Sequence, residues 1–227
     1  MQITYIYHSC FLVELENYIL LFDYYKGTLP PSNPNKHLLI FVSHKHGDHY
    51  SPTIWNLQKT HPHVSYILDQ DVEKQEDASY LQVCPNQVYH AHGIHITTLT
   101  STDEGCAFLL NIEGKTIYHA GDLNWWHWEG EEEHINAWHK QAYLKEIEKL
   151  RDQKIDLAFL PFDPRQQTAI AWGMQAILSI CSIRHVFPMH FQDDIHIMQT
   201  SLQELSFPPS SKIHIIHKEG EQFLIEE

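Results

Sequence analysis

Short apolar segments rich in β-branched and aromatic residues recur through the first half of the chain, and this pattern is typical of β-strands. The first half is therefore predicted to be mostly β. The predicted strands span residues 3–7, 11–15, 18–22, 38–42, 64–68, 94–99, 107–112 and 115–119.

The second half has helical as well as strand patterns. Ile135, Trp138, Ala142, Ile147 and Leu150 follow helical spacing, in a segment whose acidic start and lysine-containing end complement a helix dipole. A long helix is predicted from about residue 134 to 152. Further predicted elements are a strand at 157–160, a helix at 170–180, a strand ending near Pro188, a helix at 195–205 and a final hairpin at 213–225.

The order of these elements favours the α+β class. In each half strands are followed by helices, and an αββα sandwich of two mainly antiparallel sheets, with helices on the outer faces, accommodates that order. The biased segments 30–34 and 131–133 are interpreted as surface connections. No linker or internal repeat interrupts the chain, so we expect a single domain over residues 1–227.

Composition limits the partners. The formal charge of −14 disfavours nucleic acid and anionic membranes as partners. No segment reaches membrane-spanning length and the start lacks a signal peptide, so we expect a cytoplasmic protein. The four cysteines are far apart and form no CxxC pair, which argues against disulfides and against a thiolate metal site. A small-molecule substrate is the expected partner, and a homo-oligomer is left open.

Potential metal ligands cluster directly after the predicted strand at 38–42: His44, His46, Asp48 and His49. Residues two apart in an extended loop point the same way, so His44 and His46 can converge on one metal. Gly47 lets the backbone turn, which aims Asp48 and His49 at a neighbouring position. Ser51 and Pro52 suit the N-cap and first residue of a helix, so this loop is expected to be held between a strand and a helix.

This segment resembles the metallo-β-lactamase superfamily, whose HxHxDH signature it matches residue for residue, and the resemblance covers nearly the whole chain. The segments 8–11 and 20–23 are similar to the opening strands of the lactonase-like branch that includes L-ascorbate phosphate lactonase. The segments ending at Asp122 and His190 resemble the strands that present the bridging aspartate and the last histidine ligand. The resemblance implies that Asp122 bridges two metals and that His190 binds the second, with Asp48 and His49.

The sequence departs from the family at the first metal. The family supplies another histidine from the segment before the strand that leads to the bridging aspartate, and here residues 99–105 contain none. Asp103 is close to the expected place and could bind the metal through oxygen, whereas Ser101 or Thr102 could leave that position to water. A carboxylate in place of an imidazole would make manganese or iron more competitive against zinc.

Other residues are expected around the site. His8 is expected either to line the pocket or to have a structural role. The aromatic residues 125–128 are expected either to wall the pocket or to anchor the long helix, and His127 is the predicted proton donor. Arg165 is predicted either to bind a substrate carboxylate or phosphate or to form a surface ion pair. Two further histidine groups lack a carboxylate motif and are interpreted as surface residues: His61 and His63, and His90, His92 and His95.

These features predict a metal-dependent hydrolase that uses a metal-bound hydroxide on an ester, lactone, amide or phosphodiester bond of a small substrate. One or two divalent metal ions are expected, zinc first, with manganese or iron as alternatives. The rival interpretations are a phosphodiesterase or nuclease, and a catalytically weak metal-binding protein with an incomplete first site. The predicted catalytic residues are Asp48, His127 and Arg165, and the predicted ligands are His44, His46, Asp48, His49, Asp103, Asp122 and His190.

Overall fold

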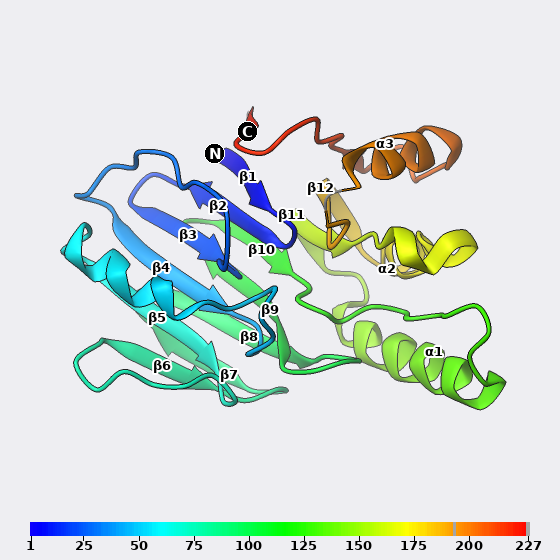
Figure 1. The fold of residues 1–227 in the computed structure, drawn as a ribbon, viewed down its shortest axis with the longest axis horizontal. Coiled ribbons are helices and arrows are strands. Elements are labelled where there is room, and N and C mark those ends of the chain that lie inside the picture. The colour runs from blue at the N-terminus through cyan, green and yellow to red at the C-terminus, as the bar shows by residue number, and fades with distance from the viewer. Residues whose placement is uncertain (193, 226–227) are drawn as a thin grey trace. The chain divides into compact units, whose positions relative to one another are not determined.

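The computed structural model describes residues 1–192 and 194–225. Its strands form two seven-stranded sheets. The chain divides into two compact units: unit 1 is Met1–Cys84 with His217–Glu227, and unit 2 is Pro85–Ile216. Each unit contains one of the sheets (Figure 1). The expectation of a single domain over residues 1–227 stays a prediction.

The sheet of unit 1 has the strand order β14-β1-β2-β3-β4-β5-β6. Strands β14, β1, β2 and β3 pair antiparallel, whereas β3, β4, β5 and β6 pair parallel. The strands are β1 (Gln2–Tyr7), β2 (Cys10–Glu14), β3 (Tyr18–Phe22), β4 (His37–Val42), β5 (Val64–Asp69), β6 (Tyr80–Val83) and β14 (Gln222–Leu224).

The central strands of unit 1 are buried on both faces. In β3, Ile19 and Leu21 point to one face and Leu20 and Phe22 to the other, and all four are fully buried. The 3-10 helix η1 (Pro52–Lys59) covers the first of these faces, because Ile54 belongs to the same apolar cluster as Ile19 and Leu21 (Figure 1). This packing fixes the strand ends from which the candidate ligands project.

The sheet of unit 2 has the order β13-β12-β11-β10-β9-β8-β7. Strands β7 to β10 pair antiparallel and β10 to β13 pair parallel. Helix α2 packs against β11 and against α1. The strands are β7 (Val88–Ala91), β8 (Ile94–Thr100), β9 (Cys106–Ile112), β10 (Lys115–His119), β11 (Lys154–Pro161), β12 (Ser182–Met189) and β13 (Lys212–Ile213). The helices are α1 (Glu133–Ile147), η2 (Glu148–Leu150), η3 (Pro164–Ala169), α2 (Trp172–Ile180) and α3 (Ile195–Glu204).

Most predicted elements are confirmed, with two corrections. The sheets are mixed rather than mainly antiparallel. The pairs β3–β4, β4–β5, β10–β11 and β11–β12 are parallel, because the connections between these strands are long enough to bring the chain back to the end at which the previous strand began. The predicted hairpin at 213–225 is wrong. Instead, β13 pairs with β12 in unit 2 and β14 pairs with β1 in unit 1.

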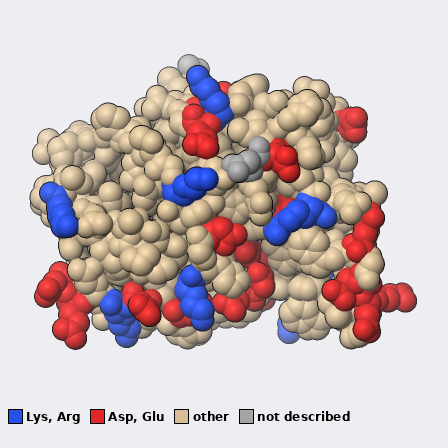
Figure 2. Space-filling model, viewed as in Figure 1, with Lys and Arg blue, Asp and Glu red and all other residues tan. Residues whose placement is uncertain are grey.

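The surface shows a mixture of charges. On the face drawn in Figure 2, lysine and arginine side chains lie singly among acidic ones. Among the described residues, no helix is both long enough and apolar enough to cross a membrane.

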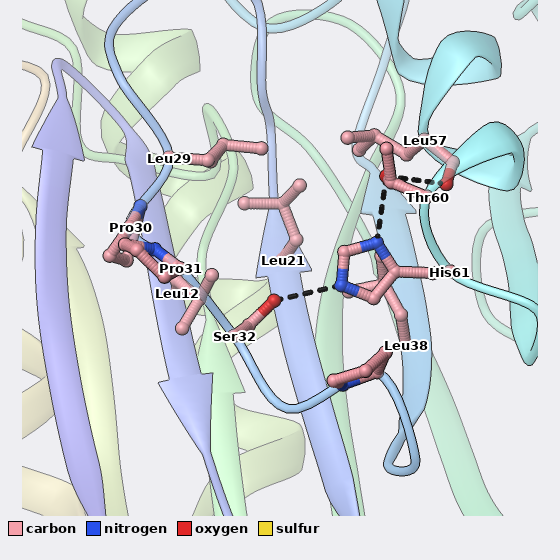
Figure 3. A pocket seen from close by; sticks show the side chains of 11 residues that line it. Leu12, Leu21, Leu29, Pro30, Pro31, Ser32, Leu38, Leu57, Thr60 and His61 are labelled. Carbon is pink, nitrogen blue, oxygen red and sulfur yellow. Dashed lines mark hydrogen bonds between the residues drawn. The ribbon is translucent and has the colours of Figure 1, made fainter.

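Unit 1 also contains a cavity of about 360 Å³ (Figure 3). Leucine and proline side chains form most of its wall, and His61 accompanies them, bonded to Ser32 at 2.8 Å. Leu38, near the start of β4, lines this cavity, whereas the histidine-rich loop follows the other end of that strand, roughly 20 Å away at the usual rise per residue. The described residues that line the cavity include no carboxylate, so it is separate from the candidate metal centre.

Candidate metal centre

The predicted ligand loop of unit 1 lies directly after β4, between that strand and η1. Ser51 caps η1, as predicted, by accepting a hydrogen bond from the backbone N–H of Thr53. The ring of His44 lies 4.5 Å from the ring of His46 and 4.2 Å from that of His49, centroid to centroid. The loop therefore brings three imidazoles together. Gly47 is outside the left-handed region, and a Cβ added to it would meet open space, so the turn does not require glycine there.

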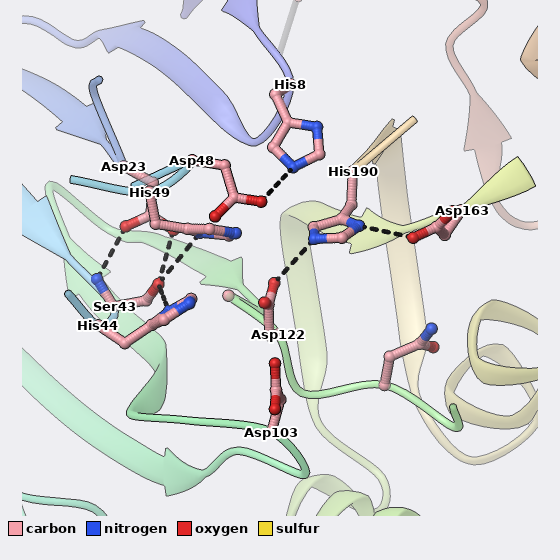
Figure 4. A network of polar contacts seen from close by, with 12 residues as sticks. His8, Asp23, Ser43, His44, Asp48, His49, Asp103, Asp122, Asp163 and His190 are labelled. Carbon is pink, nitrogen blue, oxygen red and sulfur yellow. Dashed lines mark hydrogen bonds and ion pairs between the residues drawn. The ribbon is translucent and has the colours of Figure 1, made fainter. Parts of the chain in front are cut away.

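A buried carboxylate orients His49. Asp23 follows β3 and accepts hydrogen bonds from the backbone N–H of Ser43 at 2.8 Å and from its hydroxyl at 2.7 Å (Figure 4). His49 Nδ1 lies 2.7 Å from Oδ2 of the same carboxylate. With Nδ1 donating to Asp23, Nε2 of His49 is the ring nitrogen left to bind a metal.

His8 lies at the same end of unit 1. Its Nε2 is 3.5 Å from Asp48 Oδ2. The hydrogen bond from His8 holds the pKa of the Asp48 carboxyl well below its usual range, against the opposing effect of burial. Ligand atoms of His8, Asp48 and His49 all lie within 4.8 Å of one another. A separation of this size allows several side chains to bind one ion, so His8 joins the candidate ligands.

In unit 2, Asp122 and His190 follow β10 and β12, the two strands that flank β11 in the sheet. Asp122 follows β10 after a turn in which the Gly121 N–H donates to His119 Nδ1 at 3.2 Å. His190 follows β12 directly. His190 Nε2 lies 3.4 Å from Asp122 Oδ1, a separation that suits two ligands of one metal (Figure 4).

A second buried carboxylate orients His190. Asp163 is fully buried and lies 3.0 Å from His190 Nδ1 through its Oδ2. It also accepts hydrogen bonds from the Arg165 backbone N–H and guanidinium. Burial raises the pKa of Asp163, but the hydrogen bonds from His190 and Arg165 outweigh it and leave that pKa at about 2. Asp163 is therefore charged at neutral pH, and its contact with Nδ1 leaves Nε2 of His190 as the nitrogen that could bind a metal.

The residues 125–128 divide between the two predicted roles. Trp126 donates its Nε1–H to the Asp122 carbonyl at 3.0 Å, and its ring lies 5.3 Å from that of His190. Trp128 stacks on Trp126, and the Arg165 guanidinium lies 5.6 Å from the Trp128 ring. These two tryptophans line the His190 side of the site.

The other half of this segment anchors helices. Trp125 contacts Trp172 at the start of α2 and lies under the Lys140 ammonium of α1. His127 also packs on Trp172, with ring centroids 4.8 Å apart. This contact places His127 against the start of α2. Its role as proton donor stays a prediction.

The segment without the family histidine has its own structure. Thr102 is buried, donates its hydroxyl to the Asn124 carbonyl at 2.6 Å and accepts from the Asn124 N–H at 3.0 Å. These bonds tie the segment to the chain that follows Asp122. Asp103 is exposed, and among the described residues it belongs to no set of three or more candidate ligand side chains whose ligand atoms all lie within 4.8 Å of one another.

Sequence reasoning assigned no role to Asp23, Ser43 or Asp163, the residues that orient the histidines. A signal was present, because both aspartates come within two residues of the end of a buried strand. An acidic residue at such a place is usually read as a turn residue. Its partner histidine is distant in sequence, so only the structure connects them.

Comparisons with known proteins identify the family. Residues 2–137 match the model of the β-lactamase superfamily domain, and the chain belongs to that family. A metal-dependent hydrolase of Pyrococcus furiosus is 23% identical over 208 residues, and one of Desulforamulus reducens is 26% identical over 221 residues, each match covering 84% of both chains. These relatives place the chain among the metal-dependent hydrolases of the superfamily.

Solved structures show the same fold. A metallo hydrolase from Ignicoccus hospitalis matches with a TM-score of 0.65 and 17% identity over 99% of both chains. A metallo-β-lactamase fold protein from Bacillus subtilis matches with a TM-score of 0.61 and 15% identity, over 98% of this chain and 99% of the other. The predicted fold family is thereby confirmed.

Proposed function

We propose that the protein hydrolyses an ester, lactone, amide or phosphodiester bond of a small molecule with the help of two divalent metal ions. The observation that carries the proposal is the pair of buried aspartates, Asp23 and Asp163, each bonded to Nδ1 of a candidate ligand histidine. Carboxylates in this position set the tautomer and orientation that metal binding by Nε2 requires.

The ligand assignment follows the family signature. His44, His46 and Asp103 are assigned to the first metal, and Asp48, His49 and His190 to the second, with Asp122 as the bridge between them. His8 is a further candidate ligand of the second metal. The donor set fits a first-row divalent ion, because neutral imidazoles and carboxylates suit zinc, manganese and iron alike. When bound, such ions supply an activated water and polarise the bond under attack.

The surrounding residues bind and orient the substrate. Arg165 is held by Asp163 and by the ring of Trp128, so its guanidinium has a fixed direction in which to bind a substrate carboxylate or phosphate. Trp126 covers one side of His190 and keeps water away from it. His127 donates the proton to the leaving group.

A small substrate is preferred to nucleic acid. The net charge of −14 repels a polyanion, and the basic side chains of the described surface in Figure 2 do not gather into one patch. We place the enzyme in the cytoplasm, as a monomer or homo-oligomer.

A metal-dependent substrate screen tests the function. Protein purified without chelator should contain one to two first-row metal ions per chain and turn over members of a panel of lactones, p-nitrophenyl esters and bis(p-nitrophenyl) phosphate. Chelation should remove this turnover and metal should restore it. Turnover that persists in metal-free protein, or the absence of metal uptake on reconstitution, would overturn the proposal.

A further inference from the structure

Two histidines that the hydrolase site does not use face each other in unit 2. His90 lies on β7 and His95 on β8, and the two are directly paired in the antiparallel register. Their ring centroids are 4.6 Å apart. His90 is exposed and His95 is half-buried, so both rings stand on a face of the hairpin that an ion in solution can reach. From the sequence alone, both were interpreted as surface residues.

Metal–nitrogen bonds in zinc sites are about 2.0–2.1 Å long, so two imidazoles on one ion bring their nitrogens to roughly 3–3.5 Å. Ring centroids 4.6 Å apart reach this separation by small side-chain rotations. We propose that His90 and His95 chelate a divalent transition metal ion, with water in the remaining positions. Copper should bind more tightly than nickel or zinc, in the usual order for nitrogen ligands.

The neighbours of this pair favour a cation. His95 is also paired with Asn111 of β9, and Asn111 is paired with Thr116 of β10, so the row that continues from the two histidines across the sheet is polar and uncharged. None of these paired positions has a lysine or arginine side chain that would repel a metal ion.

A second histidine pair in unit 2 shows the contrast. His185 and His214 lie 3.0 Å apart, from Nδ1 to Nε2. Burial lowers the pKa of both, and the nearby positive charge of Lys212 lowers both further. The same charge repels a metal ion, and His214 is buried. The β7–β8 pair therefore differs from an ordinary contact between two histidines in its exposure and in its uncharged surroundings.

A metal at this site would join the last two strands of the sheet. β7 is the edge strand of unit 2, and its Val88 is 56% exposed. An ion that binds both strands of the folded hairpin, and less well the unfolded chain, stabilises the pairing by mass action. The proposed role is a metal-dependent clip on an exposed sheet edge, separate from hydrolysis.

Copper titration of the full-length, metal-loaded protein tests the proposal. His90→Ala/His95→Ala should bind one Cu²⁺ fewer per chain and lose the nitrogen couplings of that ion in its electron paramagnetic resonance spectrum, with turnover unchanged. Each single variant should lower the affinity on the order of 100-fold, because one imidazole remains without its chelating partner. His134→Ala is the matched control, since His134 is 75% exposed and is paired only with Glu132 among the contacts described for it.

Two outcomes would overturn the proposal. One is a double variant, folded by circular dichroism, that binds as much Cu²⁺ as the parent. The other is an equal loss in His134→Ala, which would mean that any exposed histidine binds copper in this protein. Retention of the variants on immobilised Ni²⁺ provides an independent measurement, and the double variant should elute earlier than the control.

Discussion

The two units support their candidate ligands with the same contact but build it in different ways. In unit 1, Asp23 binds His49 Nδ1 and the neutral groups of Ser43, all of them fully buried. In unit 2, Asp163 binds His190 Nδ1 and shares its charge with Arg165, whose side chain is 54% exposed. The contacts described for Asp23 are with His49 and with the neutral groups of Ser43, whereas Asp163 also forms an ion pair with an arginine at the surface. In unit 2, Asp163 connects a candidate ligand histidine to Arg165, the residue proposed to bind substrate.

Backbone conformation adds to this comparison. His8 and Asp23 in unit 1 and His190 in unit 2 all have positive φ, at 54°, 46° and 64°. Residues with a side chain rarely adopt this conformation, and it costs energy that the surrounding structure must offset. Three of the nine non-glycine residues described with positive φ therefore lie at the candidate site, and both units contribute to them.

The largest expected effect comes from removing a ligand from either unit. Asp48→Ala and His190→Ala should each lower turnover at least about 10³-fold, because each removes a ligand of the second metal. Circular dichroism should be close to the parent, since Asp48 is partly exposed and Asp163 keeps Arg165 as a partner when His190 is lost. A folded variant with normal turnover would show that its unit contributes no essential ligand.

Substitution of the supporting aspartates, Asp23 and Asp163, should have a smaller effect on metal binding, and its effect on KM should differ between the two units. Asp23→Asn and Asp163→Asn should each weaken metal binding by roughly 10- to 100-fold, the usual result of losing such a carboxylate. Asp163→Asn should also raise KM for anionic substrates, because it releases Arg165, whereas Asp23→Asn should not. Arg165→Gln is the control: it should raise KM and leave metal affinity unchanged. Equal KM values in the two asparagine variants would contradict the proposed coupling.

The sequence predicts the candidate ligands of unit 1 more readily than those of unit 2. The candidate ligands of unit 1, His44, His46, Asp48 and His49, lie within six consecutive residues, so their pattern is visible in the sequence without knowledge of the fold. In unit 2, Asp122 and His190 were found only through the family resemblance, because each stands alone after a strand. The final β13 and β14 were mistaken for a hairpin because local pattern does not identify the partner strand. Pairing with β12 and β1 depends on contacts distant in sequence.

Acid should weaken unit 2 through His214, which lies outside the candidate site. Burial lowers the pKa of His214 from 6.5 to about 4, with further lowering by His185 and Lys212. The unfolded chain binds this proton more readily, so the stabilising contribution is present above pH 6.5 and is lost as the pH falls toward 4. A shift of this size corresponds to roughly 3 kcal/mol at most.

Urea unfolding at pH 7.5 and 4.5, for the parent and His214→Phe, measures this loss. Phenylalanine keeps the stacking on Phe187 but cannot bind a proton, so the stability difference between the two proteins should change by up to about 3 kcal/mol between the two pH values. Acid-sensitive groups that do not contact His214 are present in both proteins and cancel in the difference. His185, 3.0 Å from His214, loses its partner in the variant and does not cancel. The same pH dependence in the two proteins would show that His214 is not the group responsible.

Asp103 should give the smallest effect, because it is exposed while the other proposed ligands are at least half-buried. If its carboxylate takes the place of the absent family histidine, Asp103→Ala should weaken the first metal several-fold and leave the second bound by Asp48, His49, Asp122 and His190. Asp103→His should restore a nitrogen ligand and shift the metal preference from manganese or iron toward zinc. Neighbouring Thr102 serves as the control for local structure, since Thr102→Val breaks the bonds to Asn124 without removing a carboxylate. Metal titrations of all three variants decide the assignment: unchanged stoichiometry and metal preference in both Asp103 variants would eliminate Asp103 as a ligand and leave the first metal with His44, His46 and Asp122 alone.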